Sequence, residues 1–280
     1  MLDFEQYLRQ TLQDLPNSKV KDAMEYSLMA GGKRIRPKLL FAALNAYQVC
    51  EEKGLGAGAA IEMIHTYSLI HDDLPAMDND TLRRGKPTCH VKYGEGVAIL
   101  AGDALLTNAF KEALKSCEDS TMSSLMIDYL SDYSGANGMV YGQILDLEGE
   151  ANPNITVEEL EKIHFYKTGK LITLPLICAA IIAHRKEDIE IWKEVGHYIG
   201  LSFQIQDDVL DVTSSVEVLG KNVNSDESNQ KSTYVTLMGI DAAKEKAQFY
   251  YQKAWEWLRR LSIDTEAMEA VFDELTKRKY

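Results

Sequence analysis

The chain has 280 residues, of which 45% are hydrophobic, as is ordinary for a globular protein with one large core. Its formal net charge of −13 argues against a general nucleic-acid binder, because such proteins carry a basic surface that neutralises phosphates. We expect a single domain over residues 1–280.

The expected location is the cytoplasm, without a membrane span. The four cysteines are scattered without a Cys-x-x-Cys pair, which indicates free thiols in a reducing compartment. The N-terminus has no signal-peptide pattern, and the longest apolar run, residues 171–183, is too short to cross a bilayer.

Helical periodicity dominates the chain, without a series of alternating strands, a glycine-rich phosphate loop or a fixed-period repeat. The pattern predicts helices over residues 2–15, 20–30, 39–49, 57–73 and 123–149, one that starts within 88–107, and one from a capping box at Thr156 to Gly169. Small residues within 123–149, Gly142 among them, are expected to allow close helix contacts. The chain is therefore predicted to be all-α.

The stretch 71–90 organises the rest of the chain, because an apolar helix leads there directly into clustered carboxylates and then two arginines. The carboxylates are Asp72, Asp73, Asp78 and Asp80, and the arginines are Arg83 and Arg84. Clustered carboxylates repel one another unless a cation holds them, and hard oxygen ligands without nearby cysteine suit Mg²⁺. Arginine forks suit phosphate oxygens. The stretch predicts a Mg²⁺–phosphate site; a charged surface loop is the simpler alternative.

The spacing inside this stretch predicts a helix end. Asp72 and Asp78 are six residues apart, about 240° around an ideal helix, so an unbroken helix would point them apart. Pro75 lies between them and disfavours helix at the preceding residues. We expect the helix to stop near Leu74 and a short loop to bring Asp78 back toward Asp72.

A basic run, Lys33-Arg34-Ile35-Arg36-Pro37-Lys38, follows the glycine pair 31–32. It is either a solubilising loop or a second phosphate site, with Lys33 and Arg36 on one side of a turn. His65 and His71 lie on the apolar helix predicted over 57–73 and are by default hydrogen-bonded core residues.

A second acid cluster, Asp207, Asp208 and Asp211, follows another apolar helix. Asp207 and Asp211 are four residues apart, so both are expected to project from one face and to need a counterion. Lysines at 221 and 231 then lie in a polar loop. Two acid motifs, each followed by basic residues, are hard to attribute to chance.

Taken together and in this order, these motifs resemble those of the trans-isoprenyl diphosphate synthases, most closely the bacterial farnesyl diphosphate synthases. The likeness covers nearly the whole chain, from Gly31-Gly32-Lys33-Arg34-Ile35-Arg36-Pro37 through Lys167-Thr168-Gly169 and Phe203-Gln204 to Lys231-Ser232-Thr233-Tyr234. It implies an all-α isoprenoid synthase fold of long helices around a deep central cavity, and a homodimer. The implied reaction is the head-to-tail condensation of isopentenyl diphosphate with dimethylallyl and then geranyl diphosphate.

The resemblance also implies the roles of individual residues. Three Mg²⁺ ions per site would bind to Asp72, Asp78 and Asp207, supported by Asp73, Asp208 and Asp211. The allylic diphosphate would be held by Arg83, Lys167 and Lys221, with Lys231 nearby. Isopentenyl diphosphate would be held by Lys33, Arg36, His65 and Arg84. Thr168 and Gln204 would aim oxygen dipoles at the allylic cation. One departure is Asn224, where the family commonly has glycine; asparagine tolerates positive φ, so the turn can survive.

Product length is expected to depend on Tyr67 and Ser68, five and four residues before Asp72. In the resembling family a large aromatic residue at this place stops growth at fifteen carbons, so farnesyl diphosphate is the predicted product; a tyrosine that only packs in the core is the alternative. Other interpretations are a geranylgeranyl diphosphate synthase, a non-catalytic subunit of a prenyl synthase, a terpene cyclase and an acidic helical scaffold. The last three fit less well, because both aspartate motifs and the ordered basic residues are present.

Overall fold

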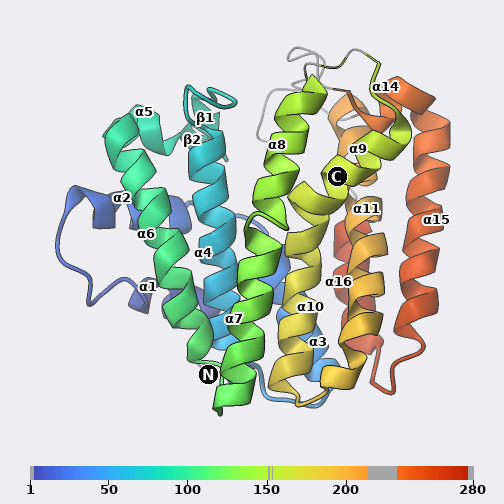
Figure 1. Ribbon diagram of the computed structural model, residues 1–280, viewed down its shortest axis with the longest axis horizontal. Coiled ribbons are helices and arrows are strands. Elements are labelled where there is room, and N and C mark those ends of the chain that lie inside the picture. Colours follow the sequence, from blue (N-terminus) through green and yellow to red (C-terminus); the bar gives the residue numbers. More distant parts are fainter. Residues whose placement is uncertain (1–2, 151, 153, 214–231, 277–280) are drawn as a thin grey trace.

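The computed structural model describes residues 3–150, 152, 154–213 and 232–276, which fold into a bundle of helices that run side by side (Figure 1). The helices are α1 Phe4–Gln10, α2 Lys19–Leu28, α3 Ile35–Ala46, α4 Leu55–Asp72, α5 Cys89–Tyr93, α6 Glu95–Leu114, α7 Ser120–Ser134, α8 Met139–Glu150, α9 Val157–His164, α10 Lys170–Ile182, α11 Ile189–Thr213, α14 Tyr234–Met238, α15 Ile240–Leu258 and α16 Glu266–Thr276. Short 3₁₀ turns, η1 Glu51–Gly54 and η3 Lys186–Asp188, precede α4 and α11, and a π-helical turn, η2 Phe165–Gly169, joins α9 to α10. In these described residues the strands amount to one antiparallel hairpin, β1 Leu82–Arg83 with β2 Lys86–Pro87. The predicted all-α fold is confirmed.

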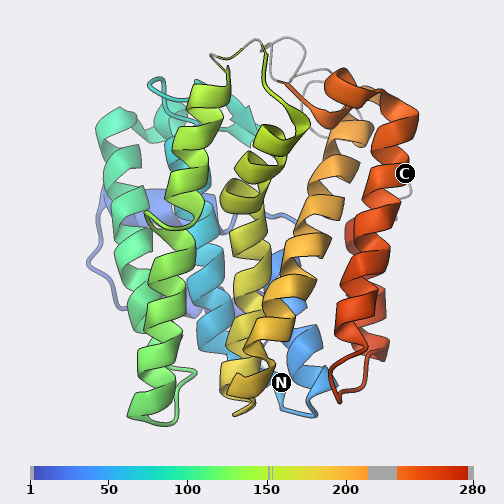
Figure 2. The same ribbon diagram turned by 45° about the vertical axis from the view of Figure 1, so that its right-hand side comes forward.

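Helix α10 lies at the centre of the bundle in both views (Figures 1 and 2). Every residue from Leu171 to Ile182 is buried, against α3, α4, α7 and α11. The continuous helical stretch Val157–Ile182 is long and apolar enough to cross a membrane, but 72% of its most apolar window is buried inside the protein. Its apolar character is therefore that of a core helix.

Helix α4 ends where the sequence predicted. Asp72 is its last residue and Asp73 caps it. The backbone N–H of Asp78 donates a hydrogen bond of 2.8 Å to the carbonyl oxygen of Asp72, so the loop through Pro75 returns Asp78 to the helix end. The capping box at Thr156, with Glu159 as its partner, is also present as predicted.

Two predicted helices were wrong in extent. The helix predicted over 2–15 ends at Gln10, and the following residues form tighter turns, such as the bond from the Leu15 N–H to the Leu12 carbonyl. The helix predicted over 123–149 is two helices, because the chain turns at Gly135 and Gly138. A Cβ on Gly138 would overlap the carbonyl of Tyr133, so only glycine allows this break.

The second aspartate motif lies inside the last turns of α11 rather than after the helix, which corrects the sequence prediction. Helix α11 packs against α10, α15 and the π-helical turn η2. The ends of α4 and α11 that carry the aspartates lie at the same end of the bundle, near the hairpin and α14 (Figure 1). The fold therefore brings two motifs that are about half the chain apart in sequence to one end of the bundle. We call the space between them the mouth.

Candidate active site

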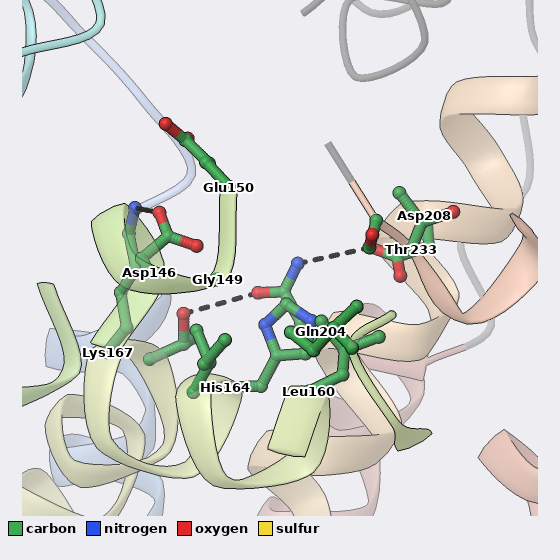
Figure 3. Close-up of a pocket in the computed structure, with 13 residues that line it drawn as sticks. Asp146, Gly149, Glu150, Leu160, His164, Lys167, Gln204, Asp208 and Thr233 are labelled. Carbon is green, nitrogen blue, oxygen red and sulfur yellow. Dashed lines mark hydrogen bonds and ion pairs between the residues drawn. The ribbon is translucent and has the colours of Figure 1, made fainter. Parts of the chain in front are cut away.

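Three adjoining cavities open between the helices at this end, and Thr168 lines all of them. The tail cavity, of about 330 Å³, has a mostly apolar surface, and Tyr67, Ser68, His71, Asp72, Gln143 and Lys167 are among the residues that line it. The basic cavity, of about 300 Å³, is lined by Lys33, Arg34, Arg36, Glu62, His65, Arg84, Gln204 and Asp207, among others. The acidic cavity, of about 150 Å³, is lined by Asp146, Glu150, Lys167, Gln204 and Asp208, among others (Figure 3). Arg36 and His65 line both the tail and the basic cavity.

The first two aspartates of the first motif lie in different environments. Asp72 lines a cavity, whereas Asp73 is paired with an arginine. Burial raises the pKa of Asp72 to about 6; Lys167 lowers it and Asp78 raises it further. The side-chain amide of Gln143 donates a hydrogen bond to Asp72. Asp73 instead is 3% exposed and pairs with the Arg83 guanidinium at 2.6 Å. Asp73 and Arg83 therefore brace one another, while Asp72 faces the tail cavity.

Lys167 projects from the π-helical turn η2, a distortion often found at functional sites. Its ammonium group lies 2.5 Å from a carboxylate oxygen of Asp146 on α8 (Figure 3). Helix α8 can approach because Gly142 faces the backbone of Lys167, where a Cβ would overlap it. The predicted close contact of small residues is confirmed at this glycine.

A chain of hydrogen bonds links η2 to the second motif (Figure 3). The Thr168 hydroxyl donates to the side-chain oxygen of Gln204 at 3.2 Å, and the Gln204 amide donates to Asp208 at 3.4 Å. Asp208 also accepts from the backbone N–H of Tyr234 at 2.9 Å, which ties α11 to α14. Asp208 therefore has structural contacts, whereas Asp207 lines the basic cavity.

Asp211 and Asp207 are one helical turn apart but lie in different surroundings. Its side chain is buried, with 3% exposed, and it lines none of the three cavities. A supporting place in the interior suits Asp211 better than direct contact with a ligand in a cavity.

The basic cavity collects four of the predicted residues, Lys33, Arg36, His65 and Arg84. Burial lowers the pKa of Arg36 to about 10; Glu62 and Asp207 raise it and Arg84 lowers it further. The Arg36 Nε is buried and has no hydrogen-bond partner among the described residues. Burial and the charge of Arg36 lower the pKa of His65 well below its ordinary value, so His65 is neutral at pH 7. A buried, underused guanidinium beside further cations is a site for an anion.

The glycine pair shapes this cavity. Gly32 adopts φ +122°, and its missing side chain leaves room for the Arg84 guanidinium, which donates a hydrogen bond to the Gly31 carbonyl. A Cβ on Gly32 would lie 2.6 Å from the central carbon of that guanidinium. The glycine pair therefore positions an arginine at this cavity.

The carboxylates of the described residues form part of a possible metal coordination shell. In the part of the chain that is described, no three histidine, cysteine, aspartate or glutamate side chains converge into a ready-made metal site. Carboxylate oxygens of Asp72, Asp78 and Asp207 near one mouth nevertheless fit Mg²⁺, which usually takes one or two carboxylates together with substrate phosphates and water. The donor set fits an ion that binds jointly with a diphosphate.

Tyr67 lines the tail cavity, with 6% of its surface exposed. Its ring meets that of His71 edge to face, with centroids 5.8 Å apart. Ser68 also lines the cavity, and its hydroxyl donates to the carbonyl of His65. An aromatic pair therefore bounds this space: His71 directly precedes Asp72, and Tyr67 lies between one and two turns before it.

Lys221, Lys231 and Asn224 lie outside the described residues. Sequence reasoning missed Gln143 and Asp146, which contact Asp72 and Lys167. Their spacing of three on one helix, directly after the close-contact Gly142, is the signal that could have found them.

The chain is similar to known proteins over most of its length. The polyprenyl synthetase family model matches residues 17–275. The farnesyl diphosphate synthase of Bacillus subtilis is 45% identical over 95% of this chain and 91% of its own length, and the geranylgeranyl diphosphate synthase of Cyanophora paradoxa is 42% identical over 90% and 84%. A Helicobacter pylori geranyltransferase, solved in complex with magnesium and isoprenyl diphosphate, superposes with a TM-score of 0.88 at 35% identity over 98% of this chain and 94% of that one. The chain belongs to the polyprenyl synthetase family.

Proposed function

We propose that the chain is a prenyltransferase that condenses isopentenyl diphosphate with dimethylallyl diphosphate and then with geranyl diphosphate, to give farnesyl diphosphate and pyrophosphate. The observation that carries this proposal is the meeting of three cavities at Thr168. The acidic cavity, the tail cavity with Asp72 and the basic cavity with Asp207 adjoin there, as two diphosphates and one growing hydrocarbon tail require.

The allylic diphosphate binds at the aspartate-rich mouth. Asp72, Asp78 and Asp207 hold three Mg²⁺ ions there, which when bound stabilise negative charge on the departing pyrophosphate. Asp73, Asp208 and Asp211 support these residues; the contacts of Asp73 with Arg83 and of Asp208 with Gln204 favour this division. Arg83, Lys167, Lys221 and Lys231 hold phosphate oxygens. Lys167 exchanges its contact with Asp146 for a phosphate, and Asp146 keeps it aimed at the mouth beforehand.

Isopentenyl diphosphate binds without metal in the basic cavity, to Lys33, Arg36, His65 and Arg84. The buried Arg36 gains a partner for its unused N–H, which makes this hydrogen bond stronger than one on the surface. Neutral His65 adds a donor without adding charge. The two substrates are thus sorted by chemistry: one site offers carboxylates for metal, whereas in the other the cations outnumber the carboxylates of Glu62 and Asp207.

The bond-forming step lies between the two sites. The allylic carbon–oxygen bond breaks, the double bond of isopentenyl diphosphate attacks the cation, and a proton leaves to the departing pyrophosphate. The Thr168 hydroxyl donates its hydrogen bond to Gln204, so its oxygen lone pairs can face the cation. The apolar tail cavity excludes water, which would otherwise trap the cation.

The tail grows into the tail cavity until it reaches Tyr67 and Ser68, which sets fifteen carbons as the product length. Geranylgeranyl diphosphate is the alternative product if Tyr67 only packs in the core. The proposed location is the cytoplasm, and the proposed assembly is a homodimer that covers apolar side chains exposed on α6 and α8, such as Ile99, Leu100 and Val140. Analytical ultracentrifugation tests the dimer directly.

Pyrophosphate release tests the proposed activity. The purified chain should release pyrophosphate only when isopentenyl diphosphate, an allylic diphosphate and Mg²⁺ are all present. No release with all three, or equal release without isopentenyl diphosphate, would overturn the assignment.

A further inference from the structure

Arg34 belongs to the basic run and borders the basic cavity, but its guanidinium is hydrogen-bonded to other parts of the chain. It is 9% exposed and is held by three other segments of the chain. Its Nε donates to Glu5 of α1 at 2.6 Å, one terminal nitrogen donates to Glu62 of α4 at 2.7 Å, and the other donates to the Leu28 carbonyl of α2 at 2.8 Å. A further bond to Glu5, at 3.1 Å, makes that contact bidentate. Such planar, bidentate pairing fixes the orientation of the arginine.

The backbone at Arg34 is strained. It adopts φ 51° and ψ 39°, the left-handed region, as the residue that precedes α3. This conformation is unfavourable for a residue with a side chain and persists only where surrounding contacts impose it. The contacts of the Arg34 side chain supply that restraint.

In the sequence, the strained residue lies between two residues that line the basic cavity. Lys33 precedes it directly, and Arg36 lies two residues later in the first turn of α3. The conformation of Arg34 therefore decides whether both side chains reach the same cavity.

The contact with Glu62 gives Arg34 a second role. The Glu62 side chain is 3% exposed and also lines the basic cavity, where its negative charge acts on Arg36. By hydrogen bonding to Arg34, this carboxylate is neutralised without occupying the Arg36 guanidinium. Without Arg34, Glu62 would repel an incoming diphosphate or compete with it for Arg36.

We propose that Arg34, gripped by Glu5 and Glu62, is a positioning residue that holds Lys33 and Arg36 ready for the metal-free diphosphate. This inference rests on the proposed function. It extends the isopentenyl diphosphate site to the N-terminal helix α1, which lines none of the three cavities.

Glu5→Gln tests this link with little risk to folding, because the Glu5 side chain is 44% exposed. Arg34→Lys is the second variant, since it keeps the charge but loses the bidentate geometry. Arg9→Ala is the matched control: it removes an exposed ion pair, Arg9 to Glu25 at 2.8 Å, from the same helix without touching the site. Binding of isopentenyl diphosphate without Mg²⁺ is measured by calorimetry, and KM is measured for both substrates.

We expect Glu5→Gln and Arg34→Lys to weaken isopentenyl diphosphate binding about tenfold or more, because misplaced binding groups lose such factors readily. The KM for geranyl diphosphate should stay within about twofold, and Arg9→Ala should change neither value. Unchanged isopentenyl diphosphate binding in both variants, or an equal rise of both KM values, would overturn the inference. A failed proposed function is distinguishable, because the wild type would then release no pyrophosphate.

Discussion

Tyr67→Ala separates a tyrosine that limits product length from one that only packs in the core. Full burial of the ring would make truncation cost about 3–5 kcal/mol. One side of the ring, however, borders a cavity of about 330 Å³, so fewer contacts are lost. We expect a loss of about 2–3 kcal/mol, or roughly 5–10 °C in Tm for a protein of this size. The space opened lies beside His71, whose ring centroid is 5.8 Å away.

The assay is mass analysis of the prenyl products of the folded variant, with Tyr133→Ala as the control. Tyr133 is 5% exposed, like Tyr67, but lines none of the three cavities. Tyr67→Ala should make products of twenty carbons or more, whereas Tyr133→Ala should lose stability and keep fifteen. A fifteen-carbon product from folded Tyr67→Ala would refute the argument, and another residue would then set the length.

Three further predictions concern the metal sites, the two diphosphate sites and pH. Asp72→Ala and Asp207→Ala should each lower turnover about 10²-fold or more while helical content by circular dichroism is retained, and near-normal turnover would exclude both as metal ligands. Arg36→Ala should raise KM mainly for isopentenyl diphosphate and Lys221→Ala mainly for the allylic substrate; a rise only in the allylic KM for both would contradict this division. Burial lowers the pKa of His164 from 6.5 to about 4, so the unfolded chain binds more protons between these values and stability falls as pH drops through them. Urea unfolding should show up to about 3 kcal/mol less stability at pH 4 than at pH 7 from this group, a loss that His164→Phe should lack.

The features that the sequence predicted correctly depend on local chemistry. Pro75 and the spacing of the aspartates predicted the end of α4, and Thr156 with Glu159 predicted the start of α9. These signals act within a few residues, so no knowledge of the packed structure is needed. The resemblance to a known family also indicated which motifs lie together. In the described part of the chain, the two aspartate motifs lie at the same end of the bundle.

Predictions from the sequence were wrong or incomplete where contacts between helices determine the structure. Gly138 and Gly142 look alike in sequence, yet one breaks the chain beside Tyr133 and the other admits the backbone of Lys167. Asp146 and Arg34 gain their roles from partners on other helices. Periodicity describes one helix at a time and cannot assign such partners.

The identity of the product tests the central claim most directly. The purified chain is incubated with geranyl diphosphate, excess isopentenyl diphosphate and Mg²⁺, and the dephosphorylated products are analysed by mass spectrometry. The account predicts one addition and the accumulation of the fifteen-carbon farnesyl product. Accumulation of a twenty-carbon product, or no elongation of geranyl diphosphate at all, would contradict it.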